Sequence, residues 1–282
     1  MSELVEKINN FRSFLSKIIF INQMIIFASA VTNEFYFTYR RIVKEEYHKW
    51  FTEYLEREFE MLVFGHGGYP LLLFPDAKGK FYQAKDEGLI SSAANLIEEG
   101  KIKVYCPDSI DADSWYNWSI HPADRVKTHI GYENVILNDI IEFIKYDSAK
   151  EKIAVAGCGM GGYHAANLTF RHPDLFSHLI SINGFFFIKQ FIFGHYDDNC
   201  YFNNPPDYLP GLNDNWYLDK IRQIGILLCT GEHDLALEEN INLSNILSLK
   251  NINHFLNVKP GFGSSWDERR AIFSECLERM IY

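Results

Sequence analysis

The stretch KIAVAGCGMGGYHAANLTFRHPDLF, residues 152–176, decides the fold of this chain. It opens with a short apolar run, passes through a glycine-rich turn and continues into a helical pattern with many small residues. Gly157 and Gly161 lie two residues before and two residues after the centre of the turn, where a chain that folds back on itself needs small residues. The turn matches G-x-S-x-G, which holds a nucleophilic serine between a strand and a helix, except that its centre is Gly159.

On both sides of this stretch the sequence alternates between strand-like and helical segments. Most strand candidates are continuous apolar runs, as expected of strands that are covered on both faces. The strand candidates are residues 59–65, 70–75, 103–108, 152–157, 178–184, 224–231 and 254–259, and the helical candidates are 89–99, 122–146, 162–172, 215–223, 236–249 and 265–281. This alternation predicts an α/β protein with a mostly parallel sheet and helices on both faces. We expect residues 44–282 to form this domain and residues 1–43 to form an N-terminal helical extension.

Composition and charge exclude several classes of function. The chain has 282 residues, 47% of them hydrophobic, which is ample for one large core. A net charge of −10 without a basic stripe excludes a nucleic-acid partner, because the phosphate backbone would be repelled. The five cysteines are irregularly spaced, so we expect reduced, mostly buried thiols and neither disulfides nor structural zinc. The ten histidines form no H-x-x-x-H, and HYDDN at 195–199 is interpreted as a solvated loop, so we expect no metal and no cofactor.

The N-terminal region leaves two alternatives for the compartment. Residues 17–31 are apolar, follow basic residues and contain Ala-Ser-Ala at 28–30, as in a signal peptide with an A-x-A cleavage site. Acidic residues ahead of the run and a polar pair inside it argue against a signal, and the run is too short to span a bilayer. We therefore expect a cytoplasmic protein whose N-terminal helix packs on the domain or mediates homo-oligomerisation. Secretion is the alternative if residues 1–30 act as a signal peptide.

The longer string around the turn resembles a known family. AGCGMGGYHAANLTFRHPDLF is similar to the esterase family of α/β hydrolases, the esterase D-like group, whose turn has the form G-C-S-M-G-G-Y-H-A. The resemblance continues through EYHKWFTEYLEREFEMLVFGHGGYPLLLFP, DSWYNWSIHPADR, YFNNPPDYLP and TGEHD, in the order of the family, and covers roughly residues 45–270. It implies an α/β-hydrolase fold and hydrolysis of a small carboxylic ester or thioester.

The family resemblance implies a Ser–Asp–His triad, of which this chain keeps one member. Asp234 stands at the acid position, although it could equally cap the helix expected to begin near Leu235. Gly159 stands at the nucleophile position and has no side chain with which to attack. Ser264 stands where the family has the catalytic histidine. The last histidine in the chain, His254, opens the final strand, roughly 16 Å from the edge of the sheet where catalysis would occur.

The expected oxyanion hole also departs from the family. It would use the backbone N–H of Met160 and one from the loop FPDAKGK, which contains Asp76 and Ala77. The family leads us to expect a glycine-rich loop here, and a carboxylate at Asp76 would repel a developing oxyanion. Cys158 is a poor substitute nucleophile, because centring the turn on it places Met160 where a small residue is required. His164 is interpreted as structural, and His66 as part of a turn.

Three hypotheses follow from these residues. The first is a degenerate hydrolase that is retained for binding or assembly and could still hold a small ester-like ligand. The second is an esterase that was inactivated deliberately at position 159; Ser264 argues against it, because trapping a substrate needs only one substitution. The third is an active hydrolase with an unconventional site.

Overall fold

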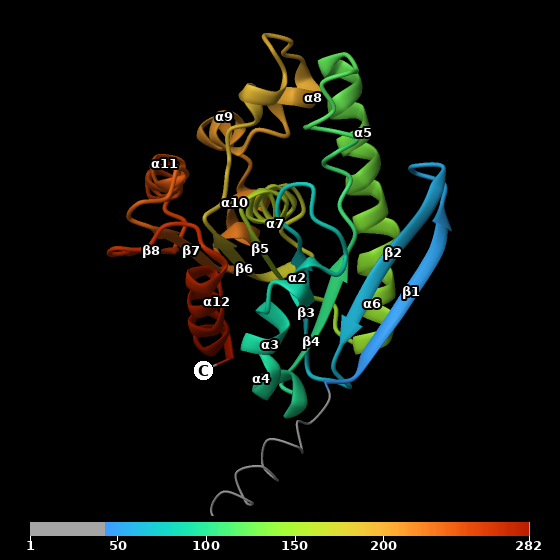
Figure 1. The fold of residues 1–282 in the computed structure, drawn as a ribbon. Helices are drawn as coiled ribbons and strands as arrows, with labels where there is room; N and C mark the ends of the chain where they lie inside the picture. Colours follow the sequence, from blue (N-terminus) through green and yellow to red (C-terminus); the bar gives the residue numbers. More distant parts are fainter. Residues whose placement is uncertain (1–42, 282) are drawn as a thin grey trace, which may run out of the picture. The chain divides into compact units, whose positions relative to one another are not determined.

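The computed structural model describes residues 43–281, which contain an eight-stranded sheet (Figure 1). The strand order is β1-β2-β4-β3-β5-β6-β7-β8. Strands β1 and β2 pair antiparallel with each other, and β2 pairs antiparallel with β4, whereas every other pairing is parallel. The strands are β1 Glu45–Thr52, β2 Arg57–Phe64, β3 Tyr69–Phe74, β4 Ile102–Pro107, β5 Ile153–Cys158, β6 Phe176–Ile182, β7 Gly225–Gly231 and β8 Phe255–Lys259.

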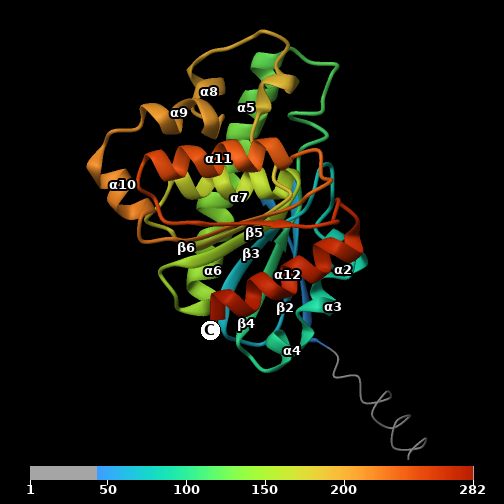
Figure 2. The same ribbon diagram turned by 90° about the vertical axis from the view of Figure 1, so that its left-hand side faces the viewer.

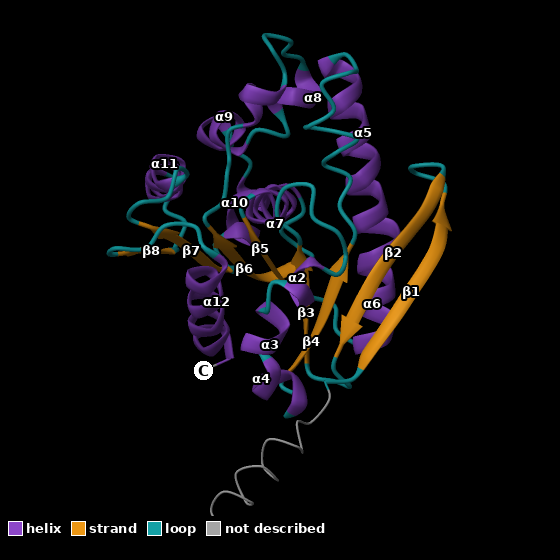
Figure 3. Ribbon diagram, viewed as in Figure 1, coloured by secondary structure: helices purple, strands orange, loops and turns teal. Residues whose placement is uncertain are grey.

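Helices cover both faces of the sheet, as the alternating sequence pattern predicts (Figures 2 and 3). One face packs against α5 to α7 and α9 to α11, and the other against α2 to α4 and α12. The helices are α2 Gln83–Asp86, α3 Leu89–Ser92, α4 Ala94–Glu98, α5 Pro122–Asn134, α6 Ile141–Ser148, α7 Met160–Arg171, α8 Asp198–Tyr201, α9 Pro205–Gly211, α10 Asn215–Ile221, α11 Leu237–Leu249 and α12 Trp266–Ile281. A π-helical segment, Val135–Ile140, joins α5 to α6, and a 3₁₀ turn spans Ile188–Phe191.

Successive side chains of the central strands point to opposite faces of the sheet, and this divides the core into two clusters. In β3, Leu71 and Leu73 point into the cluster beneath α12, whereas Leu72 and Phe74 point into the cluster beneath α7. All four side chains are almost completely buried. Burying each such side chain stabilises the fold by about 2 kcal/mol, and this contribution does not depend on any polar side chain at the strand ends.

The structure corrects two sequence predictions. Strand β1 was not predicted, because its residues alternate between exposed and partly buried and form no continuous apolar run. The single helix predicted at 89–99 is two short helices, α3 and α4, separated at Ala93. The N-terminal helix, the signal peptide and the homo-oligomer contact predicted for residues 1–43 lie almost wholly outside the described residues. Within residues 43–281, no helix combines the length and the apolar character that crossing a membrane requires.

Candidate active site

The glycine-rich turn joins β5 directly to α7. Gly159 lies between them with φ 54° and ψ −118°, a backbone conformation that residues with a side chain rarely adopt. A Cβ added at Gly157 would lie within 2.2 Å of the backbone of Gly161, and one added at Gly161 would lie 2.5 Å from the Pro75 carbonyl oxygen. The glycines at these two positions are therefore required by the close approach of the backbone, as the sequence pattern predicts.

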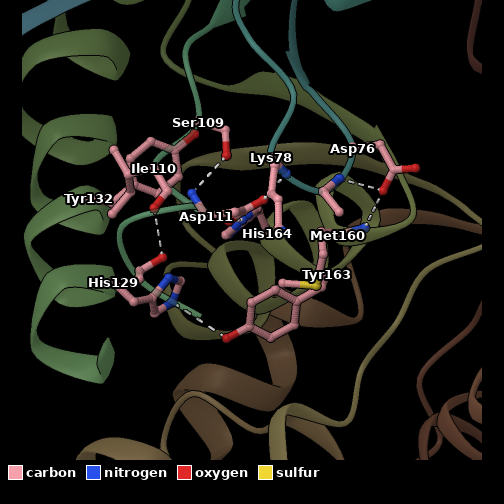
Figure 4. Close-up of polar contacts among 12 residues, drawn as sticks. Asp76, Lys78, Ser109, Ile110, Asp111, His129, Tyr132, Met160, Tyr163 and His164 are labelled. Atoms are coloured by element: carbon pink, nitrogen blue, oxygen red, sulfur yellow. Dashed lines mark hydrogen bonds and ion pairs between the residues drawn. The ribbon is translucent and has the colours of Figure 1, made fainter. Parts of the chain in front are cut away.

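A carboxylate occupies the space beside this turn. Asp76 Oδ1 accepts hydrogen bonds from the backbone N–H of Met160 at 3.0 Å and of Ala77 at 2.6 Å (Figure 4). The Met160 N–H is one donor expected for the oxyanion hole, and Ala77 lies in the loop expected to supply the other. The carboxylate also lies at the N-terminus of α7, where the helix dipole favours negative charge. Asp76 therefore points into the expected hole.

An arginine from the other end of the chain holds this carboxylate in place. Arg269 in α12 donates from Nη1 to Asp76 Oδ2 at 2.6 Å, and only 8% of its side chain is exposed, against 18% for Asp76. The guanidinium also lies 4.8 Å from the centroid of the Trp266 ring. From the other side, the backbone N–H of Asp76 donates to Gln83 Oε1 at 2.7 Å. The carboxylate is thus fixed through both of its oxygens.

No side chain fits at position 159 while Asp76 holds this conformation. A Cβ added at Gly159 would lie 2.0 Å from Asp76 Oδ1 and 2.6 Å from its Cγ, far inside van der Waals contact. The Asp76 carboxylate thus fills the space that a serine side chain at position 159 would need.

Asn183 links the expected acid position to the loop that carries the expected histidine position. Asp234 is buried, and its Oδ2 accepts a hydrogen bond from Asn183 Nδ2 at 2.6 Å. The same Asn183 nitrogen donates to the carbonyl oxygen of Gly263 at 2.9 Å, which ties the loop containing the exposed Ser264 to Asp234. Asp234 Oδ1 accepts from the N–H of Ala236, so the carboxylate also stabilises the turn that precedes α11.

The candidate replacement nucleophile, Cys158, lacks the setting of an activated thiol. Cys158 is buried at the end of β5, and burial raises the pKa of its thiol to about 12. Since the thiolate is the nucleophilic form, Cys158 is not an activated cysteine.

The three histidines considered in the sequence lie in different settings. His164 is buried in α7, and its Nε2 lies 2.8 Å from Asp111 Oδ1 (Figure 4). His66 is exposed between β2 and β3. His254 is bonded through both ring nitrogens, to Ser244 Oγ at 2.7 Å and to the Ile252 carbonyl oxygen at 2.9 Å, at the start of β8.

A cavity of about 690 Å³ lies at the opposite end of α7 from Gly159. Its lining includes Phe170, Arg171 and His172 from the C-terminal end of α7, with aromatic residues from the segment that follows β6. Among the described residues that line it, none belongs to the turn at Gly159. This cavity is therefore not the site that the esterase pattern predicts.

Sequence reasoning missed Arg269 and Asn183. Arg269 lies 193 residues from Asp76 in the chain, and nothing in the charged run DERR indicates its partner. Asn183 follows a strand at the carboxyl edge of the sheet and has φ 52°, a conformation in which asparagine is enriched. The Asn-Gly pair that directly follows this strand was the sequence signal that could have identified Asn183 as a turn residue at the site.

The comparisons with known proteins identify the family. The family described as "Putative esterase" matches residues 52–257, well over half of the chain, and the chain belongs to this family. Similar solved structures include a ferulic acid esterase, with 17% identity, a TM-score of 0.68 and coverage of 85% of this chain and 99% of that one. The S-formylglutathione hydrolase FrmB from Staphylococcus aureus has 15% identity, a TM-score of 0.64 and coverage of 86% and 98%. MPT51 (FbpC1) from Mycobacterium tuberculosis has 14% identity, a TM-score of 0.63 and coverage of 84% and 98%. No curated protein matched the sequence. The predicted α/β-hydrolase fold is thus confirmed.

Proposed function

We propose that this member of the esterase family is catalytically silent and uses its retained fold for binding or assembly. The observation that carries the proposal is the Asp76 carboxylate, which accepts hydrogen bonds from the N–H of Met160 and from that of Ala77, the groups proposed to stabilise an oxyanion. The missing serine at Gly159 and the missing histidine at Ser264 point in the same direction.

The electrostatic penalty of this arrangement is large. A second negative charge about 4 Å from the Asp76 carboxylate would be repelled by about 4 kcal/mol at an effective dielectric constant of about 20, before the opposing attraction of the Arg269 guanidinium is counted. That energy corresponds to at most roughly a thousandfold in rate. In an active esterase the same N–H groups would lower the barrier, so here the site opposes the charge it would otherwise stabilise.

A deliberately inactivated esterase is a poorer explanation. In such a variant, restoring serine at position 159 would restore the enzyme, but the Asp76 carboxylate lies where the serine side chain would have to go. An active hydrolase with an unconventional site remains the alternative. It would need a nucleophile other than Cys158, whose thiol is buried and protonated.

A reconstruction experiment tests the proposal directly. Hydrolysis of p-nitrophenyl acetate and labelling by a fluorophosphonate probe would be measured for the natural chain, for Gly159→Ser/Ser264→His, and for Asp76→Gly/Gly159→Ser/Ser264→His, with Asp76→Gly alone as control. We expect no turnover from the natural chain or the double variant and measurable turnover from the triple variant. Turnover by the natural chain above a heat-denatured control would refute the proposal, most clearly if a fluorophosphonate adduct formed.

Assembly is the part of the proposal that concerns residues 1–43. The apolar run at 17–31 is the observation that favours a docking helix there. Light scattering of the full chain and of a chain that begins at residue 44 would compare their masses in solution. We expect the truncation to reduce an oligomer to a monomer, and equal masses for the two chains would argue against this contact.

A further inference from the structure

Three potential metal ligands meet in the segment that follows β6. The ligand atoms of His195, Asp197 and Cys200 all lie within 4.8 Å of one another. His195 Nε2 and Asp197 Oδ2 are 3.4 Å apart. Cys200 belongs to α8, which lies beside α5 (Figure 1), and its side chain packs in the buried cluster that contains Trp115 and Met160.

The histidine nitrogen faces the carboxylate. His195 Nε2 is shielded from solvent and makes no hydrogen bond of ordinary geometry within residues 43–281, and its ion-pair partner is Asp197 Oδ2 at 3.4 Å. A contact this long satisfies a buried ring nitrogen only weakly. The ring itself is held by edge-to-face packing against His121, with centroids 5.4 Å apart. The nitrogen is therefore oriented toward Asp197.

The carboxylate is oriented by the start of α8. Asp197 Oδ1 accepts a hydrogen bond from the backbone N–H of Cys200 at 2.9 Å, which leaves Oδ2 on the side of His195. A hydrogen bond to the carboxylate oxygen that does not face the metal is how proteins fix a ligating carboxylate.

We propose that His195, Asp197 and Cys200 bind a zinc ion. One imidazole, one carboxylate and one thiolate are ligand types that zinc accepts, whereas calcium and magnesium require oxygen ligands throughout. A zinc–sulfur bond would form at Cys200 Sγ, and the thiol proton would be released to solvent. The fourth position would be filled by water.

The required movement is small. Zinc bonds of about 2.0–2.3 Å in a tetrahedral site put neighbouring ligand atoms about 3.4–3.6 Å apart. The His195–Asp197 separation of 3.4 Å already has this value. Since no pair exceeds 4.8 Å, the sulfur has to approach by about 1.4 Å at most, which a side-chain rotation supplies.

A cysteine nucleophile is the other chemistry that these residue types suggest. Against it, the Cys200 side chain is fully buried, so an ester could not reach the sulfur, whereas a metal ion that exchanges its water ligands needs only the small movement described above. Zinc bound here would tie the loop after β6 to α8 without taking part in chemistry at Gly159, so this site is independent of the function proposed above.

Metal titration of the full chain tests the site. The chelator-treated protein would be titrated with Zn²⁺ in competition with a chromophoric chelator, and with Co²⁺ to detect thiolate-to-cobalt absorption. We expect one Zn²⁺ per chain, and at least about a hundredfold weaker binding in His195→Gln, Asp197→Asn and Cys200→Ser. Asp197→Asn keeps the helix cap, since asparagine caps as well as aspartate, and so separates ligation from folding.

Matched controls make the result specific. Asp198→Asn removes the adjacent carboxylate of α8 and should leave zinc affinity unchanged. Cys276→Ser tests whether zinc binds elsewhere, at the pair of thiols formed by Cys276 and Cys229, whose Sγ atoms lie 3.3 Å apart. Residues 1–42 contain neither histidine nor cysteine. Failure of the natural chain to bind Zn²⁺, binding that survives Cys200→Ser, or binding lost instead in Cys276→Ser would each overturn the proposal.

Discussion

The ion pair between Asp76 and Arg269 should make a measurable contribution to stability. Its N–O distance is 2.6 Å, and the two side chains are 18% and 8% exposed. At a charge separation of about 4 Å and an effective dielectric constant of about 20, the gross attraction is about 4 kcal/mol. Desolvation and the ordering of the side chains offset part of this, so we expect a coupling energy of about 2 kcal/mol.

A double-mutant cycle measures this coupling. Asp76→Asn, Arg269→Gln and the combined variant would be unfolded in urea and followed by circular dichroism. The asparagine side-chain oxygen can still accept hydrogen bonds from the N–H groups of Met160 and Ala77, so the cycle isolates the charge interaction. We expect Asp76→Asn alone to destabilise the fold by about 2–3 kcal/mol, because it leaves a nearly buried guanidinium without its partner.

An exposed ion pair supplies the control. Arg57 and Asp113 are 2.5 Å apart but 37% and 53% exposed, so Asp113→Asn should cost less than about 0.5 kcal/mol. A coupling energy below about 0.5 kcal/mol for Asp76 and Arg269, with Asp76→Asn costing no more than Asp113→Asn, would refute the reasoning, since Asp76 would then not be held beside Gly159 as described.

Three further predictions concern single positions. Gly159→Ser should destabilise the fold by at least about 2 kcal/mol in urea unfolding, through its positive φ and the overlap with Asp76, and Asp76→Gly should relieve part of that loss. Cys158 should resist iodoacetamide at pH 8 in the native chain and react after unfolding, as read by peptide mass spectrometry, because burial raises the pKa of its thiol to about 12; native labelling would contradict this. Burial, with the nearby His164 and Arg171, lowers the pKa of His129 well below its usual value, so the unfolded chain binds the proton more tightly. Stability should therefore fall by about 1 kcal/mol between pH 6.5 and 5.5, and a His129→Asn variant that loses as much would show that another group is responsible.

Much of the fold could be predicted because it follows from local patterns. Continuous apolar runs identified the central strands, and the glycines at 157 and 161 identified the tight turn between β5 and α7. Strand β1 could not be recognised in the same way, because an edge strand with one exposed face has no apolar run. All five cysteines are buried, as predicted.

The sequence by itself determined which chemical groups are absent: position 159 has no hydroxyl, and position 264 has no imidazole. Only the tertiary structure decided what stands in their place. Asp76 and Arg269 meet at the turn, although 193 residues separate them in the chain. His195, Asp197 and Cys200 are close in the chain, but only the conformation of the segment that leads into α8 brings their ligand atoms within 4.8 Å of one another. Local pattern reflects backbone conformation and burial, which depend on near neighbours, whereas a long-range ion pair depends on which strand ends and helices the whole sheet brings together.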